Sequence, residues 1–263
     1  MLAKFGLRFV ALGYLALILM LPVAIVFVRT FQHGLAPVVN AIQQPDFLHA
    51  LYLTVLITLI VVPCNTVFGV ITALVLVRRE FPGKSLLSAL IDLPFAVSPI
   101  VVGLSLVLLY GRQGWFGGWL TAHGIQIIFA LPSMVLATIF VSLPFVVREV
   151  VPVLHEIGDE QEQAASTLGA SSWQTFWRIT LPSIRAGVAY GVILTTARAL
   201  GEFGAVSVVS GKIAGQTATL TIQVEQSYQQ FDLTGAYTAS LVLAVLALLT
   251  VFAMNLFKPK ELD

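Results

Sequence analysis

The sequence is poor in charge and in cysteine. Only 10% of its 263 residues are charged and 58% are hydrophobic, and the mean hydropathy is +0.94. A soluble domain of this composition would expose far too much apolar surface. The one cysteine, Cys64, lies in an apolar run, which excludes a disulfide framework and a thiolate metal site. The chain is therefore expected to be an integral membrane protein, and its net charge of +1 gives no reason to expect a nucleic-acid partner.

Motifs for nucleotide, metal and catalytic chemistry are missing as well. The phosphate-binding pattern Gly-x-x-x-x-Gly-Lys-Ser/Thr does not occur, since the glycines ahead of Lys212 are too widely spaced and Ile213 replaces the hydroxyl. No two histidines have metal-ligand spacing, and no nucleophile, base and orienting group recur at useful spacing. We expect this chain to bind no metal and no cofactor and to have no enzymatic activity of its own.

Long apolar runs are what the sequence does contain. A membrane-spanning helix needs about 20 mainly apolar residues. Because the runs are apolar throughout rather than alternating, they predict helices and not a barrel. The fold class expected is all-α, a single transmembrane domain over residues 1–263. Six runs are long enough, at about 9–28, 51–77, 87–111, 125–147, 186–210 and 234–257.

Basic residues fix the expected orientation of these helices. Cytoplasmic connections carry an excess of Lys and Arg. In a six-helix arrangement only Arg29, Arg112 and Lys212 fall on the outer side. Both termini and a long segment at about 150–185 are then cytoplasmic. The ten basic residues on that side are Lys4, Arg8, Arg78, Arg79, Lys84, Arg148, Arg178, Arg185, Lys258 and Lys260.

The cytoplasmic segment predicts a short polar helix. Acidic residues crowd its start, where the helix dipole favours negative charge, and Gly169 can end it. Ala164, Ala165 and Leu168 give it a small, partly apolar face. Beyond the glycine, Trp173, Phe176 and Trp177 share a second face by helical spacing. The second face alone is compatible with an interfacial helix, but the first face indicates contact with a soluble partner.

Three charged residues are expected within the bilayer: Asp92, Arg198 and Glu202. Each such residue is costly in lipid and usually faces protein or water. Arg198 and Glu202 are four residues apart, so they can pair on one helix face. Two functions stay open for this pair, locking of helix packing and a part in the translocation path.

Two segments around these charges predict interrupted helices. Pro94 and Pro99 cannot both sit in an undistorted helix, and broken backbone at membrane depth requires protein or water beside it. Glycines 201 and 204 permit a break or a close helix approach in the other segment. We expect both segments to line a central path. The candidate path residues are Asp92, Pro94, Ser98, Pro99, Arg198, Glu202, Phe203 and Gly204.

The cytoplasmic segment resembles that of the permease subunits of binding-protein-dependent ABC importers. Their signature is Glu-Ala-Ala, three residues, Gly, nine residues, and Ile-x-Leu-Pro. Ala164, Ala165 and Gly169 match it in register, as does the run from Ile179 to Pro182, whereas Gln163 replaces the glutamate. The resemblance implies a type I importer permease fold and a helix that docks into an ATP-binding subunit. The residues implied for this contact are Glu162, Gln163, Ala164, Ala165, Leu168 and Gly169.

Further stretches are similar to the sulfate and molybdate importers. Arg-Ala-Leu-Gly-Glu-Phe-Gly at 198–204 is similar to their fifth-helix motif, and Asp-Leu-Pro-Phe-Ala-Val-Ser-Pro at 92–99 looks like the W-type permease of the sulfate/thiosulfate system. The resemblance implies a bacterial inner-membrane importer of sulfate or thiosulfate. It also implies several partners: a second, related permease, two ATP-binding subunits that hold ATP and Mg²⁺, and an extracytoplasmic sulfate-binding protein.

Other functions remain as alternatives. A related molybdate or tungstate importer would share most of these motifs. A secondary anion transporter or channel would also use intramembrane Arg and Glu, although the sequence shows no convincing paired repeat. Because the residues themselves do not select the oxyanion, its identity depends on the resemblance alone.

Overall fold

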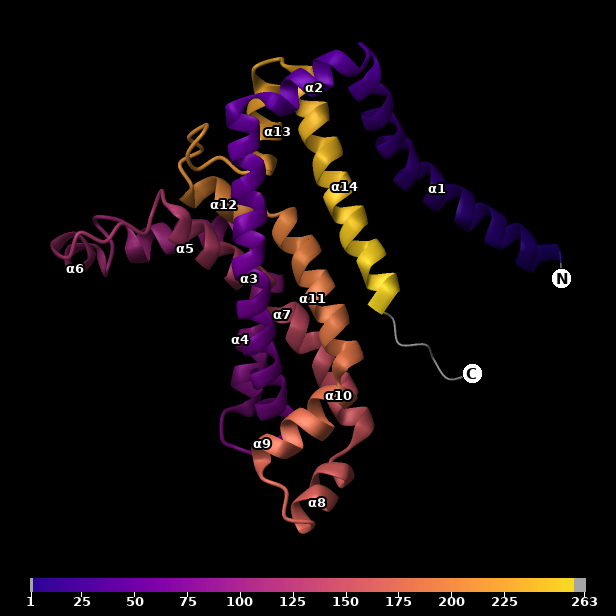
Figure 1. Ribbon diagram of the computed structural model, residues 1–263, viewed down its shortest axis with the longest axis vertical. Helices are drawn as coiled ribbons and strands as arrows, with labels where there is room; N and C mark the ends of the chain where they lie inside the picture. Colours follow the sequence, from indigo (N-terminus) through magenta and orange to yellow (C-terminus); the bar gives the residue numbers. More distant parts are fainter. Residues whose placement is uncertain (1, 258–263) are drawn as a thin grey trace.

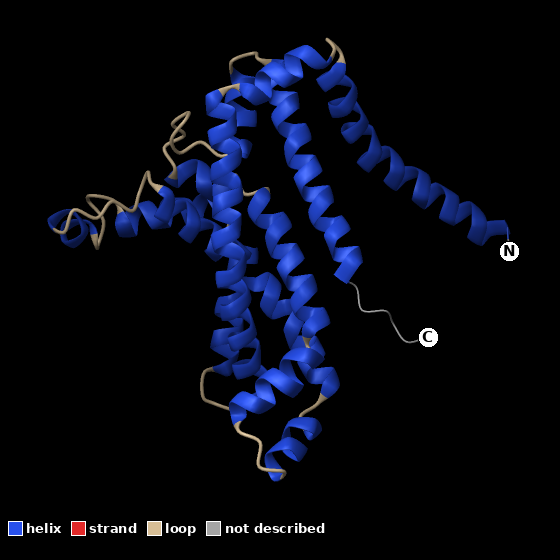
Figure 2. Cartoon of the chain, viewed as in Figure 1, coloured by secondary structure: helices blue, strands red, loops and turns tan. Residues whose placement is uncertain are grey.

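The computed structural model describes residues 2–257 of the chain, with side chains over residues 13–252 apart from residue 19. This part consists of helices and loops without a strand (Figure 2). Its elements are α1 (Leu2–Phe31), α2 (Leu35–Gln43), α3 (Pro45–Arg78), α4 (Lys84–Ala96), α5 (Pro99–Tyr110), α6 (Gly117–Ala122), α7 (Leu131–Ile157), α8 (Glu160–Thr167), α9 (Ser172–Thr175), the π-helix η1 (Phe176–Thr180), α10 (Leu181–Ser183), α11 (Arg185–Leu200), α12 (Gly204–Val209), α13 (Leu220–Gln229) and α14 (Leu233–Phe257).

Helices α3, α7 and α11 pack against one another and form the centre of the molecule (Figure 1). Helix α14 packs on α11 and α13, whereas α1 contacts α14 and α2 and then runs away from the bundle. The short elements α8–α10 lie at one end of the bundle, and α2 and α13 lie at the other (Figure 1). The predicted cytoplasmic segment therefore occupies one end of the structure.

Small residues allow the three central helices to meet closely. Val146 of α7 is fully buried between Gly69 of α3 and Gly191 of α11. A Cβ atom at Gly69 would lie 2.6 Å from the Val146 Cβ, and one at Gly191 would lie 2.8 Å from the Val146 Cα. Helices in lipid associate through such close packing because apolar burial between them gains little. These two glycines set the spacing of the bundle.

Among the described residues, four helices are long and apolar enough to cross a membrane: Gly13–Phe31, Pro45–Arg78, Leu131–Ile157 and Leu233–Phe252. The predicted span at 87–111 is instead the pair α4 and α5, bent by 111°. The predicted span at 186–210 is not one continuous helix. Helix α11 ends at Leu200, and residues 201–203 separate it from α12. The second bent pair joins Ser172–Ser183 to Arg185–Leu200 at 70°, and the described residues supply up to six candidate spans if each bent pair counts as one crossing.

The predicted span at 125–147 was wrong at both ends, because α7 runs from Leu131 to Ile157. The apolar residues before it form an extended connection in which Phe129 has φ 62° and its N–H donates to the Val209 carbonyl. Beyond residue 147 the helix continues because Leu154 is fully buried. It stops at Gly158, where φ is 63°. The first part of the segment predicted at about 150–185 thus belongs to α7, and the short elements follow from residue 158 onward.

Candidate functional site

Helix α8 ends at the glycine that the sequence indicated. Gly169 has φ 85°, a left-handed conformation that favours glycine. Its N–H donates to the Ser166 carbonyl at 3.0 Å, and the Ala170 N–H donates to the Ala165 carbonyl at 3.0 Å. These bonds satisfy carbonyls that the helix end would leave without partners. The prediction that Gly169 ends this helix is confirmed.

The outer surface of α8 is open. The helix contains no buried side chain, and Leu168 directly after it is 88% exposed. Gln163, Ala164 and Gly169 are also exposed, whereas Ala165 is half-buried. We call the exposed residues Gln163, Ala164, Leu168 and Gly169 the docking face. Its contact with an ATP-binding subunit stays a prediction.

Glu162 points away from the docking face and into the protein. Its carboxylate accepts from the Arg78 Nε at 3.0 Å and from the Thr180 hydroxyl at 2.8 Å. Successive residues on a helix differ by about 100°, which is why its neighbour Gln163 faces outward. The sequence placed Glu162 next to Gln163, the position of the signature glutamate. It gave no sign of the bonding partners of Glu162, because Arg78 and Thr180 are 84 and 18 residues away in the chain.

The predicted aromatic face on the following segment is confirmed. The Trp173 and Trp177 ring centroids are 5.5 Å apart, and those of Phe176 and Trp177 are 5.4 Å apart. Ser171 begins the segment with a capping box, because its hydroxyl accepts from the Gln174 N–H and the Gln174 side chain accepts from the Ser171 N–H. Trp173 remains 69% exposed, so part of this face is open to an interface.

Arg198 and Glu202 form the ion pair that their spacing predicts. The Arg198 Nη2 lies 2.6 Å from the Glu202 Oε2, and the Glu202 side chain is only 1% exposed. The other carboxylate oxygen accepts from the Ala205 N–H at 2.8 Å. Oε2 has no hydrogen-bonding partner among the described residues, so the guanidinium charge is what compensates it. The pair lies at the break between α11 and α12.

The two interrupted segments pack against each other at α5 and α12. A Cβ atom at Gly204 would lie 2.9 Å from the Pro99 Cβ, and one at Gly103 would lie 2.7 Å from the Ala205 carbonyl oxygen. Phe203, beside this contact, has the Lys212 Nζ 5.7 Å from its ring centroid. The break predicted from the two prolines is confirmed, because α4 ends at Ala96 and α5 begins at Pro99.

We expect Gly103→Ala to destabilise the protein. The new Cβ would also lie 2.8 Å from the Val208 Cβ, so α5 and α12 would have to separate. Overpacking of this kind costs about 1–3 kcal/mol. The thermal midpoint of the detergent-solubilised chain should fall. Gly118→Ala is the matched control because a Cβ there meets nothing within 4 Å, and an unchanged midpoint in Gly103→Ala would contradict the packing argument.

Asp92 pairs with a residue that the sequence did not suggest. Its Oδ1 accepts from the Arg148 Nε at 2.9 Å, and the Arg148 guanidinium lies 5.7 Å from the centroid of Phe95. The Arg148 and Asp92 side chains are 58% and 38% exposed. Pro94 nearby is buried, whereas Ser98 at the bend is exposed. Asp92 thus forms an ion pair between α4 and α7. It makes no hydrogen bond or ion pair with Arg198 or Glu202.

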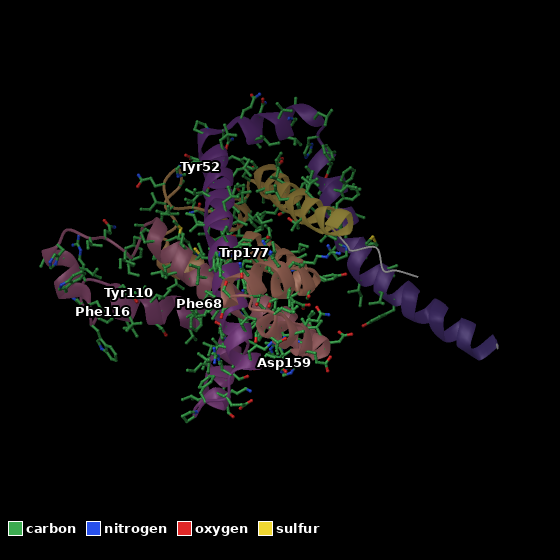
Figure 3. All side chains as sticks on the ribbon, turned by 60° about the horizontal axis from the view of Figure 1, so that its bottom comes forward. Tyr52, Phe68, Tyr110, Phe116, Asp159 and Trp177 are labelled. Carbon is green, nitrogen blue, oxygen red and sulfur yellow. The ribbon has the colours of Figure 1, made fainter. Side chains whose placement is uncertain are left out.

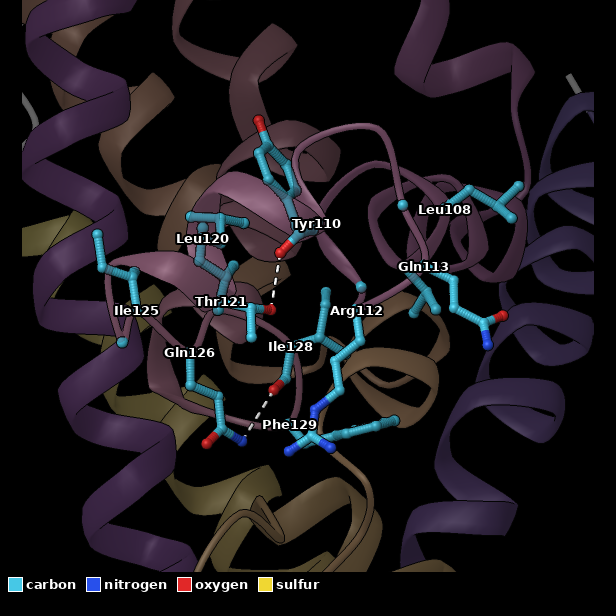
Figure 4. Close-up of a pocket in the computed structure, with 16 residues that line it drawn as sticks. Leu108, Tyr110, Arg112, Gln113, Leu120, Thr121, Ile125, Gln126, Ile128 and Phe129 are labelled. Carbon is cyan, nitrogen blue, oxygen red and sulfur yellow. Dashed lines mark hydrogen bonds between the residues drawn. The ribbon is translucent and has the colours of Figure 1, made fainter.

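A pocket of about 770 Å³ lies in the arm that α5 and α6 form, as Figure 4 shows. Arg112 and Gln126 line it, and the Gln126 amide donates to the Ile128 carbonyl at 3.2 Å. Tyr110 and Phe116 stack with centroids 5.7 Å apart in the same arm (Figure 3). None of the candidate path residues lines this pocket.

Comparison with known proteins assigns the family. Residues 65–262 match the family model described as "Binding-protein-dependent transport system inner membrane component". The chain is 53% identical to the sulfate transport system permease protein CysW of Synechocystis sp. over 98% of this chain and 93% of that protein. It is 38% identical to the sulfate transport system permease protein CysT of Escherichia coli over 93% of this chain and 88% of that protein.

A solved structure agrees at the level of the fold. A chain of a bacterial alginate ABC transporter, in complex with its alginate pentasaccharide-bound periplasmic protein, superposes with a TM-score of 0.82. The match covers 98% of this chain and 94% of that chain at 18% identity. The chain therefore belongs to the inner membrane components of binding-protein-dependent transport systems, and it is a multi-pass membrane protein.

Proposed function

We propose that this chain is a permease subunit of an ATP-driven importer of sulfate or thiosulfate in a bacterial inner membrane. The observation that carries the proposal is the 53% identity with a sulfate permease over 98% of the chain. The docking face supports it, because an exposed polar helix at one end of a membrane bundle is suited to a soluble partner. The chain forms part of the passage, and energy comes from another subunit.

Six membrane crossings with both termini in the cytoplasm are part of the proposal. The four long helices, the bent pair α4–α5 and α11 would supply the crossings. Arg78 and Lys84 flank the connection at the same end of the bundle as α8, in agreement with the excess of basic residues expected in the cytoplasm (Figure 1). The α5–α6 arm then belongs to the opposite half of the bundle.

The partners follow from the kind of system. A second permease related to CysT would complete the passage, since a relative of that name matches this chain along 93% of its length. Two ATP-binding subunits would hold ATP and Mg²⁺, and an extracytoplasmic binding protein would deliver the anion. ATP binding would draw the docking faces together and open the passage outward, and hydrolysis would return it to the inward state.

Selectivity is assigned mainly to the binding protein. The positive charge of Arg198 is already compensated by Glu202 at 2.6 Å, so it offers little net attraction to an anion. A weak site suits a passage, because an anion held tightly within it would leave slowly. The role of this chain is to open and close a path bordered by α5, α11 and α12.

We expect sulfate uptake by the assembled complex to require ATP hydrolysis. Liposomes that contain this chain, the second permease, the ATP-binding subunits and the binding protein should accumulate labelled sulfate with ATP and not with a non-hydrolysable analogue. Uptake that persists without hydrolysis would instead indicate a secondary transporter or channel. Unlabelled thiosulfate should compete in whole cells, whereas tight molybdate or tungstate uptake unaffected by sulfate would assign a different oxyanion.

A further inference from the structure

Arg78, the last residue of α3, contacts two other elements at once. Its guanidinium donates to the Leu154 carbonyl at 3.2 Å and to the Gly158 carbonyl at 2.6 Å, both at the end of α7. It also donates to both carboxylate oxygens of Glu162 in α8, at 3.0 and 3.4 Å. One side chain thereby connects a spanning helix, the end of a second spanning helix and the helix that carries the docking face.

The contact extends to the π-helix η1. Thr180 is 4% exposed and donates to the Glu162 Oε1 at 2.8 Å. The Arg78 and Glu162 side chains are 18% and 21% exposed, so water screens them less than it screens a surface pair. A planar guanidinium that meets a carboxylate through two N–H groups also fixes the relative orientation of the two groups. The network therefore has a defined geometry as well as charge.

Helix α8 has few other means of attachment. It is eight residues long, shorter than the roughly 12–15 residues at which an isolated helix becomes even marginally stable in water, and none of its side chains is buried. Gly158 and Asp159 join it to α7, and the φ of 63° at Gly158 marks a backbone position with wide conformational freedom. Without the Arg78 contacts, α8 could turn about this glycine while α3 and α7 stayed in place.

We propose that Arg78 is a positioning residue of the coupling step, which makes α8 and the ends of α3 and α7 move as one body. A displacement imposed on the docking face then reaches the spanning helices directly. The inference rests on the proposed function and adds a mechanical role for a residue outside the docking face. It also assigns a role to Glu162, whose carboxylate faces inward.

Reconstituted complexes with and without the sulfate-loaded binding protein test this inference. With Arg78→Gln we expect ATP hydrolysis to continue but no longer to rise when the loaded binding protein is added, and sulfate uptake to fall about tenfold or more, as for the loss of a charge-assisted hydrogen bond. Arg78→Lys keeps the positive charge but lacks the planar guanidinium with its two parallel N–H groups, and it should give intermediate uptake. Arg79→Gln is the matched control, because Arg79 is the exposed neighbour and should behave as wild type.

A distance measurement separates transmission from a purely structural role. Because Cys64 is the one cysteine, a Cys64→Ser background permits spin labels at Val75 in α3 and Ser166 in α8. The distance should be the same with and without trapped ATP when Arg78 is present and should shift or broaden with Arg78→Gln. If Arg78→Gln does not accumulate, Glu162→Gln replaces it with the same expectations.

Coupled uptake at the wild-type level in Arg78→Gln, or an unchanged label distance, would overturn the inference while leaving the proposed function intact. Absence of uptake by the wild-type complex would instead count against the proposed function.

Discussion

Gly169→Arg is expected to abolish transport while the chain remains inserted in the membrane. A Cβ at this position meets nothing within 4 Å, so the substitution disturbs no packing inside the chain. It places a long cation on the docking face and imposes a left-handed conformation that costs a non-glycine residue about 1–2 kcal/mol. Both effects act where an ATP-binding subunit would have to approach closely. Sulfate uptake in whole cells and co-purification of the ATP-binding subunit measure the result.

Gly124→Arg is the matched control for this substitution. Gly124 has φ 67° and equally open surroundings, but it follows α6 in the α5–α6 arm, away from α8. The backbone strain and the added charge are therefore similar, and only the location differs. We expect this variant to transport normally. Full transport with normal coupling in Gly169→Arg would show that the ATP-binding subunit does not contact the docking face.

Arg198→Met is expected to have the second large effect, a loss of folded protein. It would leave the Glu202 carboxylate, 1% exposed, without its compensating charge. Breaking a buried pair by removing one partner costs about 3–5 kcal/mol, whereas replacing both partners is often tolerated. The double variant Arg198→Met/Glu202→Gln should therefore regain the wild-type amount of folded complex. The measurements are the yield of monodisperse complex and its thermal midpoint.

Transport by the double variant then distinguishes the two functions of the pair. We expect uptake to stay below about a tenth of the wild-type rate although folding recovers, because charged groups inside a membrane protein commonly belong to a pathway. If uptake returns together with folding, the pair only locks the packing of α11 against its neighbours. A single variant could not separate these outcomes, since it loses the fold and the charge together.

Local signals in the sequence predicted much of this structure. Gly169 ends its helix through its own backbone freedom, and Arg198 meets Glu202 because residues four apart share a helix face. The break between α4 and α5 lies directly before Pro99, whose ring disfavours the helical conformation at Ser98 ahead of it. In each case the cause lies within a few residues of the effect.

Contacts between distant segments could not be predicted in this way. Arg78 and Glu162 are 84 residues apart, and Asp92 and Arg148 are 56 apart. Nothing in the local pattern of either residue identifies its partner. The wrong limits of α7 have the same origin, because the burial of Leu154 prolongs the helix beyond the point where charge in the sequence suggested its end. Tertiary packing decides such limits.

The bend between α4 and α5 has a consequence for the lipid around this chain. At about 1.5 Å per residue, thirteen residues of α4 reach roughly 20 Å and twelve residues of α5 roughly 18 Å, less than the hydrocarbon thickness of about 30 Å. Neither half is long enough to cross alone, and because of the 111° turn the pair reaches less far across the membrane than the sum of the two lengths. Acyl chains cannot solvate the polar backbone at this turn. In the proposed transporter this turn therefore has to face protein or water rather than lipid.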